Sequence, residues 1–394
     1  MGYLDVSIMV RESTLKKIKI LFVVNIDSFF VSHRLPIALE ALNKGYEVHV
    51  AAKFTDKMEM LSKLGLIVHP INFNRSRIGI LSLLMEFIQT IKILNNVKPD
   101  VAHLISIKPV ILGGIASRIV QTSNIVSAIS GLGFIFSSKG FLSILRRFIV
   151  KKLYKQAFSH PSQKIIFQNK DDRSVLLNST GILDSKTLLI PGSGVDLEKF
   201  KSNPVSSEFP IIMLVARMLS DKGVREFVEA SKILKSSNQL LFQQSRFVLV
   251  GDTDLSNPAS LDEVELKSWA QSGIVETWGH IENMPRVLNN AHIVVLPSYR
   301  EGFPKVLMEA AACGKPIITT DVPGCRDAII PDVTGLLIPA VDATALANAI
   351  KSLLNDLPRC LSMGIEGRKF AEQQFDITQV ISSHMSIYEE LINK

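Results

Sequence analysis

Residues 292–339 have the sequence HIVVLPSYREGFPKVLMEAAACGKPIITTDVPGCRDAIIPDVTGLLIP, and this stretch decides the fold. The apolar run from Ile293 to Leu296 predicts a buried strand, and Pro304 begins a helix after the loop of residues 297–303. In an open parallel sheet, ligands bind beyond the carboxyl ends of the strands, where helix N-termini offer unpaired N–H groups to anions. Glu301 in the loop and Glu309 in the helix add two carboxylates, which suit hydroxyl groups. The stretch therefore predicts a site for a ligand that carries both phosphate and hydroxyls.

Similar apolar runs, each typical of a parallel strand, recur on both sides of this stretch. They occupy residues 18–24, 46–52, 66–71, 101–106, 125–130, 164–169, 211–217, 246–251, 274–279 and 316–321. Helical stretches alternate with them, which is typical of doubly wound α/β domains. The polar segment 202–207 interrupts the series and is interpreted as a linker.

We therefore expect a first domain over residues 1–201 and a second over residues 202–372, with the ligand cleft between them. The apolar spacing from Ile377 to Leu391 predicts a final amphipathic helix within residues 373–394. A chain of 394 residues with 47% hydrophobic and 21% charged residues fits two ordered domains and argues against disorder. Three cysteines without C-x-x-C spacing fit reduced thiols, and residues 1–17 lack a signal peptide, so we expect a cytoplasmic protein.

The net charge of +7 is unevenly distributed along the chain. The segment from Lys139 to Phe158 carries six Lys or Arg and no acidic residue, and apolar residues are interleaved among them. A basic amphipathic helix of this kind is typical of contact with an anionic membrane surface, so we expect peripheral membrane association and no binding to nucleic acid. In the competing interpretation, the apolar residues pack on the first domain and the basic ones are only solvated.

The glutamate pair, with Gly302, Phe303 and Pro304 between its members, resembles the E-x7-E motif of retaining glycosyltransferases with the GT-B architecture. The resemblance to glycosyltransferase family 4 extends through residues 314–316 and 323–326 to Gly335. It implies an α/β GT-B fold, in which two Rossmann-like domains face each other across a cleft and a C-terminal helix crosses back to the first domain. The branch that the chain looks most like builds bacterial O-antigen and capsular polysaccharide.

The resemblance also implies the reaction and its substrates. A hexose or N-acetylhexosamine would pass from a nucleotide-diphosphate sugar, with UDP expected as the nucleotide, to a saccharide on a polyprenyl diphosphate carrier at the inner face of the plasma membrane. Arg217 and Lys222 would hold the leaving diphosphate, Glu301 the donor-sugar hydroxyls and Glu309 the ribose. Because two cations can neutralise a diphosphate without a metal ion, no metal or other cofactor is expected. The other donor-binding residues implied are Gly251, Gly302, Phe303, Pro304, Lys305 and Val306.

Four residues of the first domain are candidates for the acceptor side, namely His33, Arg34, His103 and Lys108. The loop of residues 25–34 lacks the paired glycines of many relatives, so its His33 and Arg34 either meet the acceptor or only cap a helix. His103 occupies the first position of a segment that often carries H-x-H in the resembled family, and Ile105 occupies the second. A satisfied core histidine fits the sequence at His103 equally well.

The sequence allows two rival functions and disfavours one rival site. A UDP-sugar 2-epimerase shares the two-domain fold, and a non-catalytic protein that binds sugar nucleotides or membranes would need no turnover. Asp252-Thr253-Asp254 forms the D-x-D triplet that holds Mn²⁺ in GT-A enzymes, but two Rossmann-like domains argue against that class. The chain contains no G-x-x-x-x-G-K-[ST] and no complete G-x-G-x-x-G, which disfavours a P-loop kinase and a nicotinamide dehydrogenase.

Overall fold

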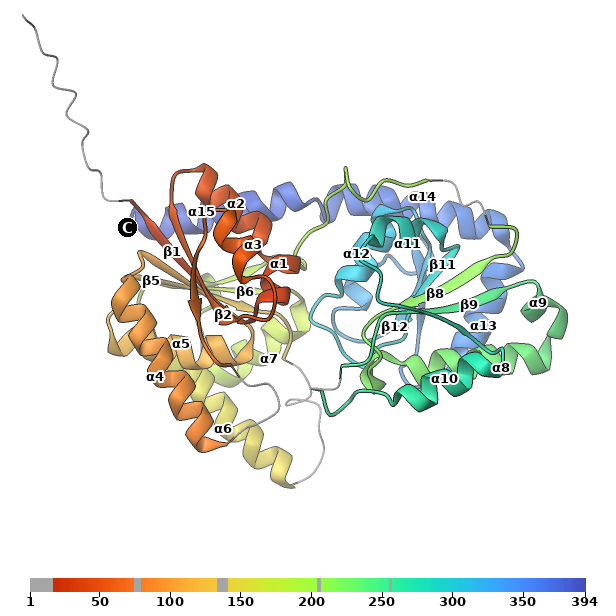
Figure 1. Ribbon diagram of the computed structural model, residues 1–394, viewed down its shortest axis with the longest axis horizontal. Coiled ribbons are helices and arrows are strands. Elements are labelled where there is room, and N and C mark those ends of the chain that lie inside the picture. Colours follow the sequence, from red (N-terminus) through yellow and green to blue (C-terminus); the bar gives the residue numbers. More distant parts are fainter. Residues whose placement is uncertain (1–16, 74–78, 133–140, 204–206, 255–256) are drawn as a thin grey trace, which may run out of the picture.

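The computed structural model describes residues 17–73, 79–132, 141–203, 207–254 and 257–394, with the backbone alone for residues 141–146. The chain forms two α/β domains side by side, and its last helix crosses from the second domain back to the first (Figure 1). Both sheets are entirely parallel, as continuous apolar strand sequences predict for sheets that are covered on both faces. This arrangement confirms the predicted α/β GT-B architecture.

The first domain has a seven-stranded sheet with the order β3-β2-β1-β4-β5-β6-β7. Its strands are β1 (Lys19–Ile26), β2 (Glu47–Lys53), β3 (Ile67–Pro70), β4 (Val101–Ile105), β5 (Asn124–Ile129), β6 (Gln163–Phe167) and β7 (Thr187–Leu189). Its helices are α1 (Asp27–His33), α2 (Leu35–Asn43), α3 (Met58–Lys63), α4 (Ile80–Val97), α5 (Ile107–Ile119), α6 (Phe141–Ala157) and α7 (Lys170–Thr180). Helix α2 packs on one face of the sheet, and α4 to α7 pack on the other.

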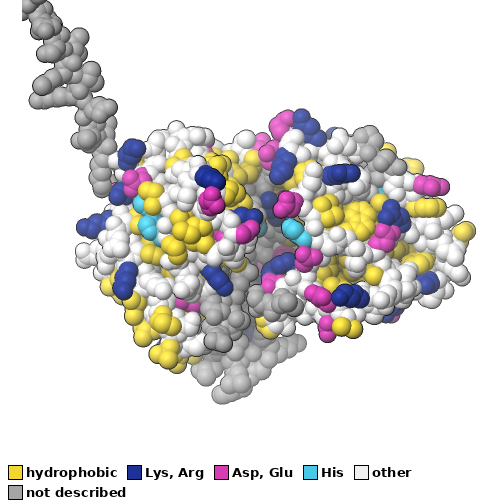
Figure 2. Space-filling view, in the orientation of Figure 1, with side chains coloured by type: hydrophobic (Ala, Val, Ile, Leu, Met, Phe, Trp, Pro, Cys, Tyr) yellow, Lys and Arg dark blue, Asp and Glu magenta, His cyan; other side chains and the backbone are white. Residues whose placement is uncertain are grey.

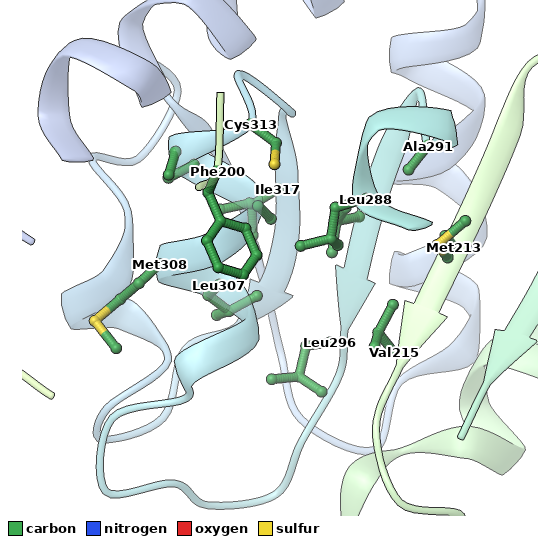
Figure 3. Close-up of a cluster of buried hydrophobic side chains, with 14 of the residues drawn as sticks. Phe200, Met213, Val215, Leu288, Ala291, Leu296, Leu307, Met308, Cys313 and Ile317 are labelled. Carbon is green, nitrogen blue, oxygen red and sulfur yellow. The ribbon is translucent and has the colours of Figure 1, made fainter. Parts of the chain in front are cut away.

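The second domain has a six-stranded sheet with the order β10-β9-β8-β11-β12-β13. Its strands are β8 (Ile211–Val215), β9 (Arg246–Val250), β10 (Glu276–Gly279), β11 (Ile293–Leu296), β12 (Ile317–Thr320) and β13 (Gly335–Ile338). Its helices are α8 (Val224–Ser237), α9 (Gln239–Gln243), α10 (Glu263–Gln271), α11 (Met284–Asn290), α12 (Lys305–Ala312), α13 (Ala343–Leu354) and α14 (Leu357–Gln374). Figure 3 shows part of its core, in which Phe200 packs beside Leu307 of α12 and Ile317 of β12.

Two chain segments cross between the domains and are hydrogen-bonded to each other. The backbone N–H of Val195 donates to the carbonyl oxygen of Phe375 at 2.7 Å, and that of Ile377 donates to the carbonyl oxygen of Val195 at 3.1 Å. Helix α15 (Ile377–Ile392) then buries Met385 and Tyr388 in the core of the first domain, on the face that α2 also covers. The crossing helix expected from the sequence is therefore present.

The sequence-based strands are confirmed, but not every element was predicted. Strands β7 and β13 were not among the expected runs, and residues 25–34 form helix α1 in place of most of the expected loop. A buried carboxylate explains the helix: Asp27 accepts hydrogen bonds from the backbone N–H groups of Ser28, Thr55 and Lys57 at 2.8, 2.6 and 3.2 Å. These bonds fix the start of α1 against the segment after β2.

Candidate active site

A cleft of about 740 Å³ lies between the two domains, at the carboxyl ends of both sheets. Its walls come from the ends of β1, β2, β3, β5 and β6 and the segments after them in the first domain, and from the corresponding parts of β8, β9 and β11 in the second. The polar residues that line it are Asn25, Ser28, Ser32, His33, Lys53, Ser130, Gln168, Arg217, Lys222, Asp254, Glu301 and Lys305. This is the crevice in which doubly wound sheets bind ligands.

An ion pair between Lys222 and Glu301 lines this cleft, and both side chains are largely buried. Ser298 also donates its hydroxyl to Glu301 Oε1 at 2.8 Å, so the carboxylate is held by two partners. Gly223, the residue after Lys222, has a φ of 72°, and a Cβ there would overlap the carbonyl of Pro297. This close approach packs the loop that carries Lys222 against the loop that carries Glu301. The fold therefore brings together the two predicted residues, which are 79 positions apart in the sequence.

Arg217 and Asp254 form a second ion pair at the cleft, with 2.6 Å between Nη1 and Oδ2. The arginine side chain is half exposed, so it can exchange this carboxylate for an anionic ligand at small cost. Gly251 lies beside this pair, in an adjoining hollow of about 610 Å³ that is also lined by Val250, Ile281 and Met284. Arg217 lines both spaces.

Helix α12 begins at the cleft, where Pro304, Lys305 and Val306 line the wall. Glu309, one turn further on, is buried and forms an ion pair with Lys305 at 3.2 Å. Burial raises the pKa of Glu309 above its ordinary value, although the nearby cations of Lys305 and Lys199 lower it in part. Glu309 lies behind the lining of the described cleft, and Lys305 stands between the two.

Gly302 lies at a contact between the two domains. Asn169, after β6, donates its side-chain amide to the carbonyl oxygen of Gly302 at 2.7 Å. A Cβ on Gly302 would overlap the carbonyl of Ser130, so only glycine fits this contact. An ion pair between Arg300 and Asp172 lies beside it.

Sequence reasoning missed Asn169, Ser130 and Lys53. The available signal was their position at or directly after the carboxyl ends of β6, β5 and β2, which were expected to border the cleft.

His33 lines the cleft, where its ring stacks on Phe29 with 4.2 Å between ring centres. Burial, with help from the cations of Arg34 and Lys305, lowers the pKa of His33 to about 3. The ring is therefore neutral at physiological pH and can take part in hydrogen bonds without carrying charge.

The other three acceptor-side candidates do not line the cleft. His103 is buried in the core of the first domain, with its Nδ1 hydrogen-bonded to the Tyr388 hydroxyl at 2.6 Å and its ring stacked on His384. His103 is therefore a core histidine, which is one of the two roles that the sequence allowed equally. Arg34 is also buried and donates to the carbonyl oxygen of His33 at 2.9 Å. Lys108 forms an ion pair with the buried Glu86 at 3.2 Å.

The D-x-D triplet makes ordinary protein contacts. Asp252 accepts a hydrogen bond from the backbone N–H of His280 at 3.0 Å, and Asp254 pairs with Arg217. Within the described residues, no three His, Cys, Asp or Glu side chains come together in a way that could hold a metal ion.

Comparison with known proteins gives matches over nearly the whole chain. Residues 195–370 match the family described as "Glycosyl transferases group 1", and residues 19–169 match "Glycosyl transferase 4-like". A Campylobacter jejuni protein named N,N'-diacetylbacillosaminyl-diphospho-undecaprenol alpha-1,3-N-acetylgalactosaminyltransferase is 31% identical over 91% of this chain and 95% of its own. An Escherichia coli UDP-Gal:alpha-D-GlcNAc-diphosphoundecaprenol alpha-1,3-galactosyltransferase is 27% identical over 71% of this chain and 72% of its own.

Solved structures show the same fold at lower sequence identity. Anabaena Alr3699/HepE in complex with UDP superposes with a TM-score of 0.75 at 17% identity, over 95% of this chain and 100% of that one. WaaG, a glycosyltransferase of lipopolysaccharide biosynthesis, gives a TM-score of 0.73 at 16% identity over 94% and 99% of the two chains. With the family matches and the paired Lys222 and Glu301 in an interdomain cleft, the chain belongs to the group 1, family 4-type glycosyltransferases and is a hexosyltransferase of the GT-B fold.

Proposed function

We propose that this enzyme transfers a hexose or N-acetylhexosamine from a UDP-sugar to a saccharide on a polyprenyl diphosphate, with retention of anomeric configuration, during synthesis of a surface polysaccharide. The ion pair of Lys222 and Glu301 at the cleft carries the proposal, because it sets a cation for phosphate beside a carboxylate for sugar hydroxyls. The two relatives named above act on undecaprenol-diphosphate-linked sugars, which supports this class of acceptor.

In this proposal, the diphosphate, the sugar and the nucleoside of the donor each contact a different part of the second domain. Its diphosphate lies between Arg217 and Lys222, near the N-terminus of α12, whose unpaired N–H groups favour negative charge. The donor sugar lies against Glu301. The nucleoside extends to the hollow beside Gly251, where Val250, Ile281 and Met284 offer an apolar wall for a base, and its ribose reaches Glu309 when Lys305 turns away from their ion pair.

The chemistry needs positioning and charge stabilisation more than a protein base. The acceptor hydroxyl attacks the anomeric carbon from the side of the departing diphosphate. The new bond to the acceptor oxygen forms as the bond to the phosphate oxygen breaks, and the hydroxyl proton passes to that phosphate oxygen. Lys222 and Arg217 stabilise the negative charge of the leaving UDP, so we propose that no protein-held metal is required. The neutral His33 on the opposite wall can orient the acceptor hydroxyl.

Peripheral association with the cytoplasmic face of the plasma membrane completes the proposal. On α6, Phe148 and Ile149 are exposed side by side with Lys151, Lys152 and Lys155. The ammonium of Lys152 lies 4.6 Å from the centre of the Phe148 ring. Lys139, Phe141, Leu145 and Arg146, which belong to the same expected contact, lie outside the residues whose side chains are described. Exposed apolar side chains beside cations are typical of helices that bind the surface of an anionic leaflet.

Mass spectrometry of the product tests the proposal directly. The protein is incubated with UDP-galactose or UDP-N-acetylgalactosamine and with undecaprenyl-diphosphate-linked N-acetylglucosamine or N,N'-diacetylbacillosamine. We expect one of these combinations to give the mass of a lipid-linked disaccharide, and NMR of the anomeric proton to show an α-linkage. Two other outcomes would support the rival functions. A new UDP-sugar epimer formed from the donor alone would support an epimerase. A complete lack of reaction with every pair of donor and acceptor would support a non-catalytic binding protein.

A further inference from the structure

Helix α4 exposes an apolar face that none of the described residues of the first domain covers. The exposed fractions are 85% for Ile80, 77% for Leu81, 51% for Leu84, 60% for Met85 and 42% for Ile88. Their spacing places Leu81, Leu84 and Ile88 on one side of the helix. Figure 2 shows hydrophobic side chains gathered at the lower edge of the first domain, where α4 lies in Figure 1. A contiguous apolar patch of this kind indicates an interaction site.

The apolar character is confined to the first half of the helix. In the second half, the exposed positions are Lys92, Asn95 and Asn96. Among the described residues, α4 is the helix that is long and apolar enough to cross a membrane, and 22% of it is buried. Its apolar half, residues 80–88, extends only about 13 Å at 1.5 Å per residue, against about 30 Å for the hydrocarbon of a bilayer. That half therefore suits a helix end lying in the leaflet surface.

A buried ion pair fixes which face of α4 is turned outward. Glu86 is almost fully buried and accepts hydrogen bonds from Lys108 Nζ at 3.2 Å to each of its carboxylate oxygens. Removing one partner from such a pair leaves an uncompensated buried charge, which is strongly disfavoured. The pair thus holds α4 against α5, with the apolar side chains on the opposite side.

This exposed face continues into the active-site cleft. A hollow of about 320 Å³ lies between β2 and α4, and its lining includes Met85 and Gln89 of the helix. Lys53 and Phe73 line both this hollow and the cleft. Lys53 is exposed at the carboxyl end of β2 and forms no ion pair within the part of the chain that the structure describes. A cation therefore stands where the hollow beside α4 meets the cleft.

We propose that the lipid-linked acceptor enters the cleft beside α4: its apolar chain stays with the exposed face of α4 in the membrane surface, and Lys53 binds its diphosphate. The proposal rests on the function proposed above and assigns the acceptor path to residues of this chain. The cations of α6 in the same domain match the charge of an anionic leaflet, which favours a lipid over a protein as the occupant of the apolar face. An acceptor that follows this path brings its sugar past Lys53 to the wall opposite Glu301.

Two variants separate the chain-binding part from the diphosphate-binding part. Both are assayed with undecaprenyl-diphosphate-linked N-acetylglucosamine in vesicles and with a water-soluble short-chain analogue that has the same diphosphate and sugar. Replacing Leu81, Leu84 and Ile88 by glutamine should raise the KM for the long-chain acceptor by about 100-fold and leave that for the short-chain analogue unchanged. Lys53→Gln should raise the KM for both acceptors by about 10- to 100-fold, while the Kd for UDP stays as in the wild type.

Matched controls are available elsewhere on the surface. Leu357, Leu361 and Ile365 form an exposed apolar stripe on α14, and their replacement by glutamine should change neither KM. Lys63→Gln, at an exposed ion pair with Glu59, is the control for Lys53. Wild-type KM values for the long-chain acceptor in the α4 and Lys53 variants would overturn the inference.

A vesicle-binding measurement keeps this test independent of turnover. If the wild-type enzyme transfers to no lipid-linked acceptor, it is the proposed function that fails. Co-sedimentation with vesicles of phosphatidylglycerol and phosphatidylcholine still decides the role of α4. Loss of the salt-resistant part of binding in the α4 variant supports the inference, and binding equal to that of the wild type overturns it.

Discussion

Asn169 of the first domain donates its side-chain amide to the carbonyl oxygen of Gly302 in the second, across a distance of 2.7 Å. Gly302 follows Glu301 directly, so the first domain holds the backbone of the second-domain loop that we propose to bind the donor. The ion pairs of Arg300 with Asp172 and of Arg326 with Asp171 reinforce the same contact. The complete site therefore exists only while the two domains are together.

Gly302→Ala should force the domains apart, because the added Cβ would overlap the carbonyl of Ser130. A displacement of about 1 Å at the reacting centre can cost about 100-fold in rate, and we expect a loss of at least that size in kcat. The affinity for UDP should change little, since its predicted contacts lie in the second domain. Small-angle scattering should show a larger radius of gyration. Gly79→Ala, where a Cβ meets open space, is the control.

Lys222→Met and Glu301→Gln should each lower kcat by about 100- to 1000-fold, because each removes a group that we propose to contact the reacting part of the donor. Since the two side chains are paired, the losses should not multiply in the double variant. A double-mutant cycle on kcat/KM measures this coupling, with the exposed pair of Arg225 and Glu265 as control. Fully multiplicative losses would show that the two residues act independently.

Glu309→Gln should raise the melting temperature at neutral pH while it lowers transfer. Burial raises the pKa of Glu309, and a carboxyl with a raised folded-state pKa loses stability as pH rises from its unfolded value through its folded one. Glutamine has no charge to bury, so its advantage should disappear below about pH 4, where the glutamate is protonated as well. Melting curves over pH test this, and a variant less stable than wild type at pH 7 would contradict it.

Transfer should continue in the presence of EDTA. In the proposed mechanism, Arg217, Lys222 and the N-terminus of α12 supply the positive charge that a divalent ion would otherwise provide. Initial rates with and without EDTA, followed by addition of Mn²⁺ or Mg²⁺, measure the dependence. Asp252→Asn distinguishes a structural role from a metal-binding one, and metal-dependent turnover that this variant abolishes would restore the D-x-D interpretation.

Replacing Lys151, Lys152 and Lys155 on α6 by glutamine should weaken binding to anionic vesicles. Each such residue near an anionic leaflet is worth about 1 kcal/mol, so three of them correspond to about 150-fold at low salt. The melting temperature should stay unchanged, because α6 reaches the core through Tyr154 and not through these lysines. If binding to phosphatidylglycerol vesicles in low salt matches that of the wild type, α6 is not a membrane contact.

The sequence predicted the strands well because strands buried on both faces must be continuous apolar runs, as in β1 and β11. It missed β7, which has three residues, since so short a run carries no clear pattern. It also missed α1, where the helix depends on Asp27 accepting hydrogen bonds from a segment 28 to 30 residues away. Such long-range bonds leave no local trace in the sequence.

The candidate site shows the same division between local and long-range information. The motif around Glu301 lies in one stretch and was found, and Lys222 was found through the resemblance that accompanies it. His103 could not be assigned, because its environment is made by Tyr388 and His384 of α15, more than 280 residues later. The contact of Asn169 with Gly302 depends on how the two domains pack against each other. The strand pattern of each sheet does not predict that packing.

Helix α15 has a consequence for how the protein is made. Its residues Met385, Tyr388 and Leu391 belong to the core of the first domain, yet the ribosome delivers them after the whole second domain. Until then, the face of the first sheet around Phe22 and His103 is not covered by α15 and can form non-native apolar contacts. The first domain can therefore complete its fold only after the second domain has been synthesised. A nascent chain stalled within α14 would expose apolar core surface of the first domain to chaperones.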